Sequence, residues 1–196
     1  MKTIYIERSS GQVRDGDWVE KLDLDGVERI VVGTGPGSFA GIRSAIAFAQ
    51  GYALGRPCEV FGLPSPCAVA AKVYGMEYGI VKGTDGLCRL AVVGDARCGK
   101  LWIAVFDGYS LDGDVFQVGR DEIADAIDGL AGKPCLVVTV DEPRIGALLM
   151  EVFGERYIGG RTPDADGLRL FAEANPSILK PEPLPIYLNP AVRGDA

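Results

Sequence analysis

The stretch from Val31 to Gly55, VVGTGPGSFAGIRSAIAFAQGYALG, has the residue types most capable of chemistry. Three glycines within five residues precede an apolar segment, and glycine turns that lead from a strand into a helix often hold phosphate. The spacing excludes both common nucleotide loops, because Ile42 replaces the lysine of a Walker A loop and Ser38 replaces the third glycine of the dinucleotide motif. The pattern favours a tight turn that lets the helix pack closely. An anion supported by Arg43 is the alternative.

A second group, Asp95, Arg97 and Lys100 in GDARCGK, has the types needed for acid–base chemistry or substrate binding. The chain contains no histidine, which excludes Ser-His-Asp and Cys-His catalysis and every His-containing metal site. The pattern therefore favours a hairpin turn in which Asp95 caps backbone amides and Arg97 pairs with a neighbouring carboxylate.

Other acidic and thiol groups also lack a functional pattern. The pairs Asp112/Asp114 and Asp164/Asp166 do not continue as calcium loops, so we interpret them as turn carboxylates. None of the five cysteines is spaced as in zinc or redox motifs. Cys98 is expected to be exposed and incidental, and the other thiols reduced and mostly buried. The sequence thus predicts no catalytic, cofactor-binding or metal-ligating residue.

Strands and helices alternate along the chain, which predicts an α/β protein with mixed sheets. Strands are expected at Thr3–Glu7, Gln12–Val19, Arg29–Gly33, Cys58–Leu63, Leu87–Val93, Lys100–Phe106, Val115–Val118 and Pro134–Val140. Helices are expected over Phe39–Ala53, Pro64–Gly75, Arg120–Gly132, Pro143–Gly154 and Asp164–Pro176. Ser38 and Ser65 are expected N-caps, GDARCG is the expected hairpin turn, and the tail Lys180–Arg193 is expected to be extended because of its four prolines.

Composition sets the broad class of the protein. The chain has 196 residues, is 47% hydrophobic and carries a net charge of −7. That length fits one domain or two small lobes, for which we expect residues 1–86 and 87–196. The acidic balance gives no expectation of direct nucleic-acid binding. Neither a signal peptide nor a membrane span is expected, and a cytoplasmic location follows from the free thiols.

Four segments of the chain stand out as longer patterns. They are VVGTGPGSFAGIRSAIAFAQGYALGRP (Val31–Pro57), GLPSPCAVA (Gly62–Ala70), VVGDARCGKLWIAVF (Val92–Phe106) and EPLPIYLNPAVR (Glu182–Arg193). Together these segments resemble the TsaB (YeaZ) family of bacterial tRNA threonylcarbamoyladenosine biosynthesis. They occur in the family's order. The resemblance implies an actin-like, Hsp70-like (ASKHA) fold of two lobes with mixed sheets.

The resemblance also implies a role. It points to a non-catalytic scaffold that pairs with a TsaD-like catalytic subunit, joined by a TsaE-like ATPase, in threonylcarbamoylation of adenosine 37 of tRNA. No cofactor is implied for the chain itself, with ATP or ADP only at a complex interface. Isolated family members also form homodimers. The implied partner interface consists of Gly35, Gly37, Ser38, Phe39, Ile42, Arg43 and Ile46.

The sequence departs from the family pattern at two places. Glu7-Arg8-Ser9 stands where actin-like nucleotide binders have an Asp-Thr-Ser-like phosphate loop, and only EKLDLDGVE separates Val19 from Arg29. The second departure leaves no room for the family's helix there and predicts a reduced N-terminal lobe. Two alternatives stay open: a nucleotide-binding enzyme of actin-like fold that uses the Gly33–Gly41 loop, or a diverged dimeric paralogue outside tRNA modification.

Overall fold

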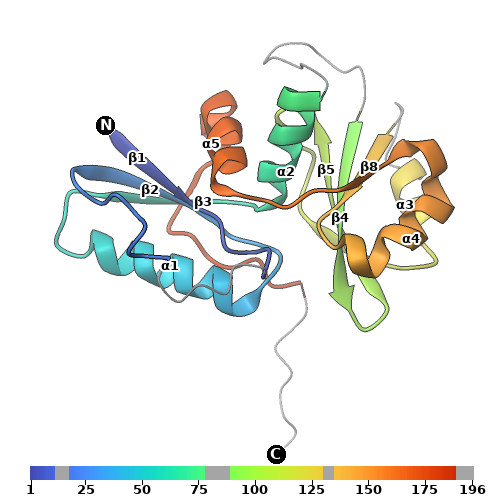
Figure 1. The fold of residues 1–196 in the computed structure, drawn as a ribbon, viewed down its shortest axis with the longest axis horizontal. Helices are drawn as coiled ribbons and strands as arrows, with labels where there is room; N and C mark the ends of the chain where they lie inside the picture. Colours follow the sequence, from blue (N-terminus) through green and yellow to red (C-terminus); the bar gives the residue numbers. More distant parts are fainter. Residues whose placement is uncertain (12–17, 78–88, 130–134, 189–196) are drawn as a thin grey trace, which may run out of the picture. The chain divides into compact units, whose positions relative to one another are not determined.

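The computed structural model describes residues 1–11, 18–77, 89–129 and 135–188 (Figure 1). The chain forms two compact units. Unit 1 contains Met1–Asp85, Gly108–Ser110 and Thr162–Ile186, and unit 2 contains Gly86–Asp107, Leu111–Arg161 and Tyr187–Ala196. This grouping differs from the predicted division at 86/87 in one main respect. The segment 162–186 returns to unit 1, because its helix packs against elements formed by the first 77 residues.

The sheet of unit 1 is mixed. Strands β1 (Lys2–Ile6), β2 (Val27–Gly33) and β3 (Glu59–Leu63) run parallel in that order, and the short β10 (Lys180–Pro181) pairs antiparallel with β3. The three predicted strands in this region are therefore confirmed, whereas β10 was not expected as a strand. Most of the strand predicted at 12–19 lies outside the described residues.

Helices cover both faces of this sheet (Figure 1). Helix α1 (Phe39–Ala53) lies against one face, and α5 (Ala165–Ala174) lies on the other beside α2 (Pro66–Lys72). A π-helical turn, η1 (Val73–Glu77), extends α2, and a 3-10 turn, η3 (Pro176–Ile178), follows α5. The core under α1 consists of Ile6, Val27, Ile30, Val32, Ile42, Ala45, Ile46 and Ala49.

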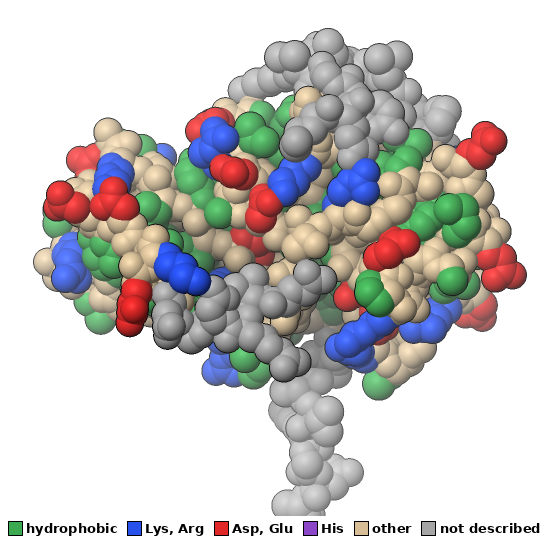
Figure 2. Space-filling model, viewed as in Figure 1, with side chains coloured by type: hydrophobic (Ala, Val, Ile, Leu, Met, Phe, Trp, Pro, Cys, Tyr) green, Lys and Arg blue, Asp and Glu red, His purple; other side chains and the backbone are tan. Residues whose placement is uncertain are grey.

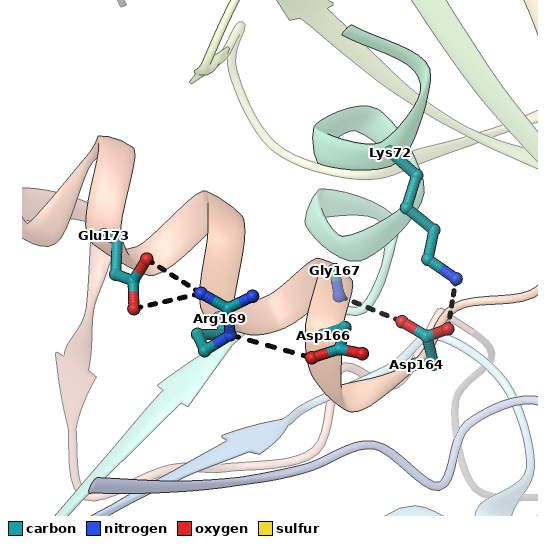
Figure 3. Close-up of polar contacts among 6 residues, drawn as sticks. All are labelled: Lys72, Asp164, Asp166, Gly167, Arg169 and Glu173. Atoms are coloured by element: carbon teal, nitrogen blue, oxygen red, sulfur yellow. Dashed lines mark hydrogen bonds and ion pairs between the residues drawn. The ribbon is translucent and has the colours of Figure 1, made fainter. Parts of the chain in front are cut away.

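Polar contacts join α5 to α2 (Figure 3). Asp164 caps α5 by accepting the backbone N–H of Gly167 at 2.9 Å, and the same carboxylate forms an ion pair with Lys72 of α2. Arg169 links Asp166 and Glu173 along the outside of α5. Asp164 and Asp166 are thus helix-start and ion-pair residues rather than the turn carboxylates that the sequence suggested.

Unit 2 is built on a five-strand path with order β6-β5-β4-β8-β9, and β7 pairs with β5. The strands are β4 (Arg89–Arg97), β5 (Lys100–Asp107), β6 (Ser110–Leu111), β7 (Phe116–Gly119), β8 (Cys135–Thr139) and β9 (Tyr157–Gly160). Helices α3 (Ile123–Gly129) and α4 (Glu142–Phe153) pack on this sheet, with the 3-10 turn η2 (Gly154–Arg156) after α4. The predicted hairpin is confirmed, but strands β6 and β9 were missed.

The hairpin turn is tighter than predicted. Gly94–Arg97 belongs to β4, and only Cys98 and Gly99 connect the two strands. Gly94 lies within van der Waals reach of the Trp102 ring, where a β-carbon would come 2.3 Å from the indole. The glycine therefore marks a packed strand position, which sequence reasoning took for a turn. Among the described residues, no helix is long and apolar enough to cross a membrane.

Candidate functional site

The glycine loop connects β2 to α1 and packs against the residues that follow β1. The Gly35 N–H donates to Ser65 Oγ at 3.0 Å, and the Ser65 N–H donates back to the Gly35 carbonyl at 2.9 Å. The Ser38 N–H donates to the Ser9 carbonyl at 2.7 Å. The loop is thus held on one side by the start of α2 and on the other by the segment 7–9.

Three glycines permit this close packing. A β-carbon at Gly33 would lie 1.9 Å from Glu7 Oε2, one at Gly37 would lie 2.3 Å from the Ser9 carbonyl oxygen, and one at Gly41 would lie 2.1 Å from the Arg8 carbonyl oxygen. The contacts at Gly37 and Gly41 are with backbone carbonyl groups, so glycine is required there, whereas a side chain at Gly33 would have to displace the carboxylate of Glu7. The interpretation of these glycines as packing residues agrees with this geometry.

Glu7 fills the centre of the loop. Its carboxylate is buried, Oε1 accepts the Ser9 N–H at 2.6 Å, and Oε2 has no hydrogen-bond partner among the described residues. Burial raises the pKa of Glu7, and interactions with Ser9 and Ser65 offset part of that rise. No cationic side chain of the described residues lies within ion-pair distance of it. An uncompensated carboxyl group at this place disfavours a second anion such as phosphate.

Helix α1 begins where the sequence predicted. Ser38 caps it by accepting the Gly41 N–H at 3.3 Å. Ile42 and Ile46 are 3% and 6% exposed and point into the core of unit 1, and Gly35 is also buried. These three residues were expected near the partner contact. They face inward because they share the side of the helix that Ala45 and Ala49 use to pack on the sheet.

The outer face of α1 is formed by other residues. Phe39 and Leu54 are 58% and 78% exposed, and Arg43 stacks on the Phe39 ring with 4.8 Å between guanidinium and ring centre. Between them runs an exposed stripe of small side chains, which consists of Ala40, Ser44, Ala47 and Gly51. Sequence reasoning identified Phe39 and Arg43 but missed the stripe. Its signal is the spacing i, i+4, i+7, i+11 of small residues.

Gly51 stands apart from the other glycines of this region. A β-carbon there would meet nothing within 4 Å, and the residue lies in the last turns of α1 with ordinary helical geometry. Glycine at such a position lowers helix stability by about 0.5–1 kcal/mol relative to alanine. Packing against the described residues does not explain this glycine.

Asp95 in unit 2 organises the end of the hairpin. Its side chain is 7% exposed, its Oδ1 accepts the Arg97 N–H at 3.0 Å, and its own N–H donates to Asp141 Oδ2 at 2.9 Å. Arg97 returns to the same carboxylate at 3.7 Å. The predicted roles, with Asp95 capping a local amide and Arg97 pairing with a carboxylate, are confirmed. The additional approach of Arg120 and Arg144 was not foreseen.

The thiols follow the expected distribution where they are described. Cys98 is exposed at the hairpin turn, Cys67 and Cys135 are buried, and Cys58 is half-buried, while Cys88 lies outside the described residues. Burial raises the pKa of the Cys67 thiol well above its usual range, which leaves it protonated and unreactive. The described residues contain no group of three metal-ligating side chains.

Two units, each a mixed sheet packed with helices, define the chain as a two-lobed α/β protein of the actin-like, Hsp70-like class. YeaZ from Pseudomonas aeruginosa superposes with a TM-score of 0.63 at 19% identity, covering 95% of this chain and 99% of that chain. A second structure, described as an uncharacterized protein with similarity to peptidase YEAZ from Pseudomonas aeruginosa, gives a TM-score of 0.60 at 23% identity. It covers 91% of this chain and 82% of that one.

The family follows from the sequence match. The model of the family TsaD, described as tRNA N6-adenosine threonylcarbamoyltransferase, matches residues 19–133, and the chain belongs to this family. Together with the YeaZ-like fold, this confirms the resemblance to TsaB (YeaZ) proteins and connects the chain with threonylcarbamoylation of tRNA. Among curated proteins, no sequence matches the chain.

Proposed function

We propose that this chain is a non-catalytic scaffold subunit that pairs with a TsaD-type catalytic subunit through the outer face of α1. The pair, joined by a TsaE-type ATPase in the cytoplasm, transfers a threonylcarbamoyl group to adenosine 37 of tRNA. Family membership supports the reaction, and the exposed stripe of small residues on α1 supports the pairing. A helix with small side chains along one face lets a partner helix approach closely.

The main support for the proposal is the exposed glycine at position 51 of α1. It weakens α1, yet no described residue fills the space that its β-carbon would take. A partner helix crossing at Gly51 explains both facts, since a β-carbon there would hold the two backbones apart. At the two ends of the stripe, the exposed side chains of Phe39 and Leu54 provide apolar area that such a partner would bury.

Glu7 supports a scaffold rather than a nucleotide-binding role. Its carboxyl group occupies the loop that would have to receive a phosphate, and Gly33 has no side chain because Glu7 needs the space. ATP or ADP would then bind only where two subunits meet. Calorimetry with ATP tests the alternative of an actin-like nucleotide-binding enzyme, because tight binding by the isolated chain would contradict a pure scaffold.

The same face of α1 also serves a homodimer when the chain is alone. A small-residue stripe is self-complementary in an antiparallel helix pair, and exposed apolar side chains favour association over solvent exposure. Size-exclusion chromatography of the isolated chain should therefore show a dimer that a TsaD-type subunit displaces.

A pair of arginine substitutions tests the interface. Ala47→Arg places a long charged side chain in the middle of the stripe and should abolish binding of a TsaD-type subunit in titration calorimetry, without unfolding the chain. Met150→Arg is the matched control, because Met150 is an apolar residue 54% exposed on α4 of unit 2. Equal binding by both variants and the wild type would refute the proposed interface.

A further inference from the structure

Three arginines converge on the buried carboxylate of Asp95. They come from three separate elements: Arg97 ends β4, Arg120 follows β7, and Arg144 lies in the first turn of α4. Their guanidinium nitrogens lie 3.7, 3.6 and 3.6 Å from the Asp95 oxygens. Three cations assembled by distant segments around one acid form a built cluster rather than a chance surface contact.

The arginines keep donors for another ligand. The three separations exceed hydrogen-bond length, so Asp95 attracts the guanidinium groups without using their N–H donors. The side chains of Arg97, Arg120 and Arg144 remain 62%, 45% and 46% exposed. An arginine that serves only as an ion-pair partner is expected to form close hydrogen bonds with its acid, as Arg156 does with Asp128 at 2.6 Å.

The cations here outnumber the two carboxylates that form the cluster with them, although the chain is acidic. Two carboxylates, Asp95 and Asp141, stand against the three arginines, and Lys100 lies opposite Arg97 in the strand register. Asp121 and Glu122 are exposed nearby, and Glu122 accepts the Gly119 N–H at 2.9 Å. Their charges offset this excess, so the site attracts an anion through its aimed guanidinium donors rather than through a net positive charge. Lys and Arg side chains gather over the free end of the β4–β5 hairpin, at the lower right of Figure 2.

The backbone of Arg97 is held in an unusual conformation. Its φ is 68°, in the left-handed region that non-glycine residues rarely adopt, and the β4–β5 register shifts between Asp95 and Arg97. Such a bulge redirects a side chain, and bulges and left-handed residues concentrate at functional sites. Here the bulge brings Arg97 to the same carboxylate as Arg120 and Arg144.

We propose that Arg97, Arg120 and Arg144 form a phosphate-binding site, positioned by Asp95, that contacts the phosphodiester backbone of the RNA substrate. This rests on the proposed function, which supplies an RNA partner. Guanidinium groups with free, forked donors suit phosphate oxygens. Their position at the exposed end of a hairpin suits an extended polyanion, which can approach a convex surface.

The test measures binding of a fluorescent tRNA anticodon stem-loop to the full-length chain over a range of salt concentrations. Each of Arg97→Gln, Arg120→Gln and Arg144→Gln should weaken binding and lower the slope of log affinity against log salt by about 1. Arg156→Gln is the control, because it removes the same charge from a guanidinium already committed to Asp128. Equal losses of RNA affinity for all four variants would mean that only the net charge of the chain matters, and would overturn the proposed site.

Two further arms separate the alternatives. Asp95→Asn keeps an acceptor for the Arg97 N–H but removes the charge that draws the three guanidinium groups together, so it should weaken RNA binding several-fold. Tighter binding by this variant would mean that Asp95 only reduces the local positive charge, and it would overturn the positioning role of Asp95. Inorganic phosphate that displaces the stem-loop at equal concentration would assign the site to free phosphate and overturn the RNA assignment. Unchanged association of these variants with the TsaD-type subunit would leave the proposed scaffold role intact whatever the RNA result.

Discussion

Each unit of the molecule has a buried carboxyl group near the end of a strand, Glu7 in unit 1 and Asp95 in unit 2, and the two groups have opposite surroundings. Glu7 of unit 1 lies under glycines, with one oxygen unpartnered and no cation of the described residues in ion-pair reach. Asp95 of unit 2 lies among three arginines, and its oxygen accepts a backbone N–H. The first carboxyl group closes a loop against anions, whereas the second gathers cations for one.

The two regions show that a sequence motif and the local charge can give opposite predictions of where an anion binds. The glycine loop has the appearance of a phosphate cradle, but its glycines make room for Glu7 and for the carbonyl groups of residues 8 and 9. The hairpin end has no phosphate motif, yet it carries exposed guanidinium groups in a fixed arrangement. Charge and available donors decide where an anion binds.

Two glycines of α1 provide the largest expected change in stability and its matched control. Gly41→Ala should lower the free energy of unfolding by on the order of 3 kcal/mol, because the new methyl group would overlap the backbone carbonyl of Arg8. Gly51→Ala, ten residues along the same helix, should raise it by about 0.5–1 kcal/mol. Urea denaturation measures both. Destabilisation by both variants would contradict the open space assigned to Gly51.

Removal of the acid in unit 2 should have the next largest effect. Asp95→Leu leaves the Arg97 N–H without its acceptor and removes a negative charge that all three arginines share. A loss of about 2 kcal/mol is expected. Thermal denaturation at low and high salt measures it, and the loss should shrink at high salt because the exposed guanidinium charges are then screened. A loss that does not depend on salt would argue against mutual repulsion of the arginines.

Glu7→Gln tests the burial of the Glu7 carboxyl group through the pH dependence of stability. Because burial raises the pKa of Glu7 above its ordinary value of 4.5, the native chain keeps this proton at pH values where the unfolded chain has released it. Its contribution to stability is therefore full at low pH and falls as pH rises through the raised pKa. Glutamine does not titrate, so the variant should gain on the order of 1 kcal/mol over wild type at pH 8. Denaturant titrations at pH 5 and pH 8 compare the two proteins, and a wild type that gains stability over this range relative to the variant would refute the assignment.

Single arginine changes should have the smallest effect on stability. Arg97→Gln, Arg120→Gln and Arg144→Gln each remove a half-exposed cation at ion-pair distance, for which a change within about 0.5 kcal/mol is expected. Thermal denaturation checks this. A large loss of stability in any one variant would mean that the arginine stabilises the hairpin and is not available to a ligand.

Much of the fold could be predicted because local signals agree with the final packing. The strands ending at Gly33 and Leu63 are compact apolar runs, and the Ser38 cap with its helical apolar spacing defines α1. Strands β9 and β10 were missed because YIGG and KP are too short and too poor in apolar alternation to signal a strand. Their pairing depends on partners far away in the sequence.

The site was less predictable because it depends on tertiary contacts. Periodicity shows that α1 has apolar residues on more than one side, but it does not tell which side meets the sheet, so Ile42 and Ile46 were assigned outward and lie inward. The arginine cluster combines residues 97, 120 and 144, whose approach to Asp95 is set by the pairing of β4, β5 and β7 and the start of α4. No local pattern carries that information.

The central claim is tested most directly by complementation of a bacterium depleted of its TsaB protein, scored by the threonylcarbamoyladenosine content of its tRNA. The account predicts that the wild-type chain and the Met150→Arg variant restore the modified nucleoside together with a cognate TsaD-type subunit. Ala47→Arg, expressed at the same level, should not restore it. Full restoration by Ala47→Arg, or none by the wild type when the cognate partner is present, would contradict the scaffold role of the outer face of α1.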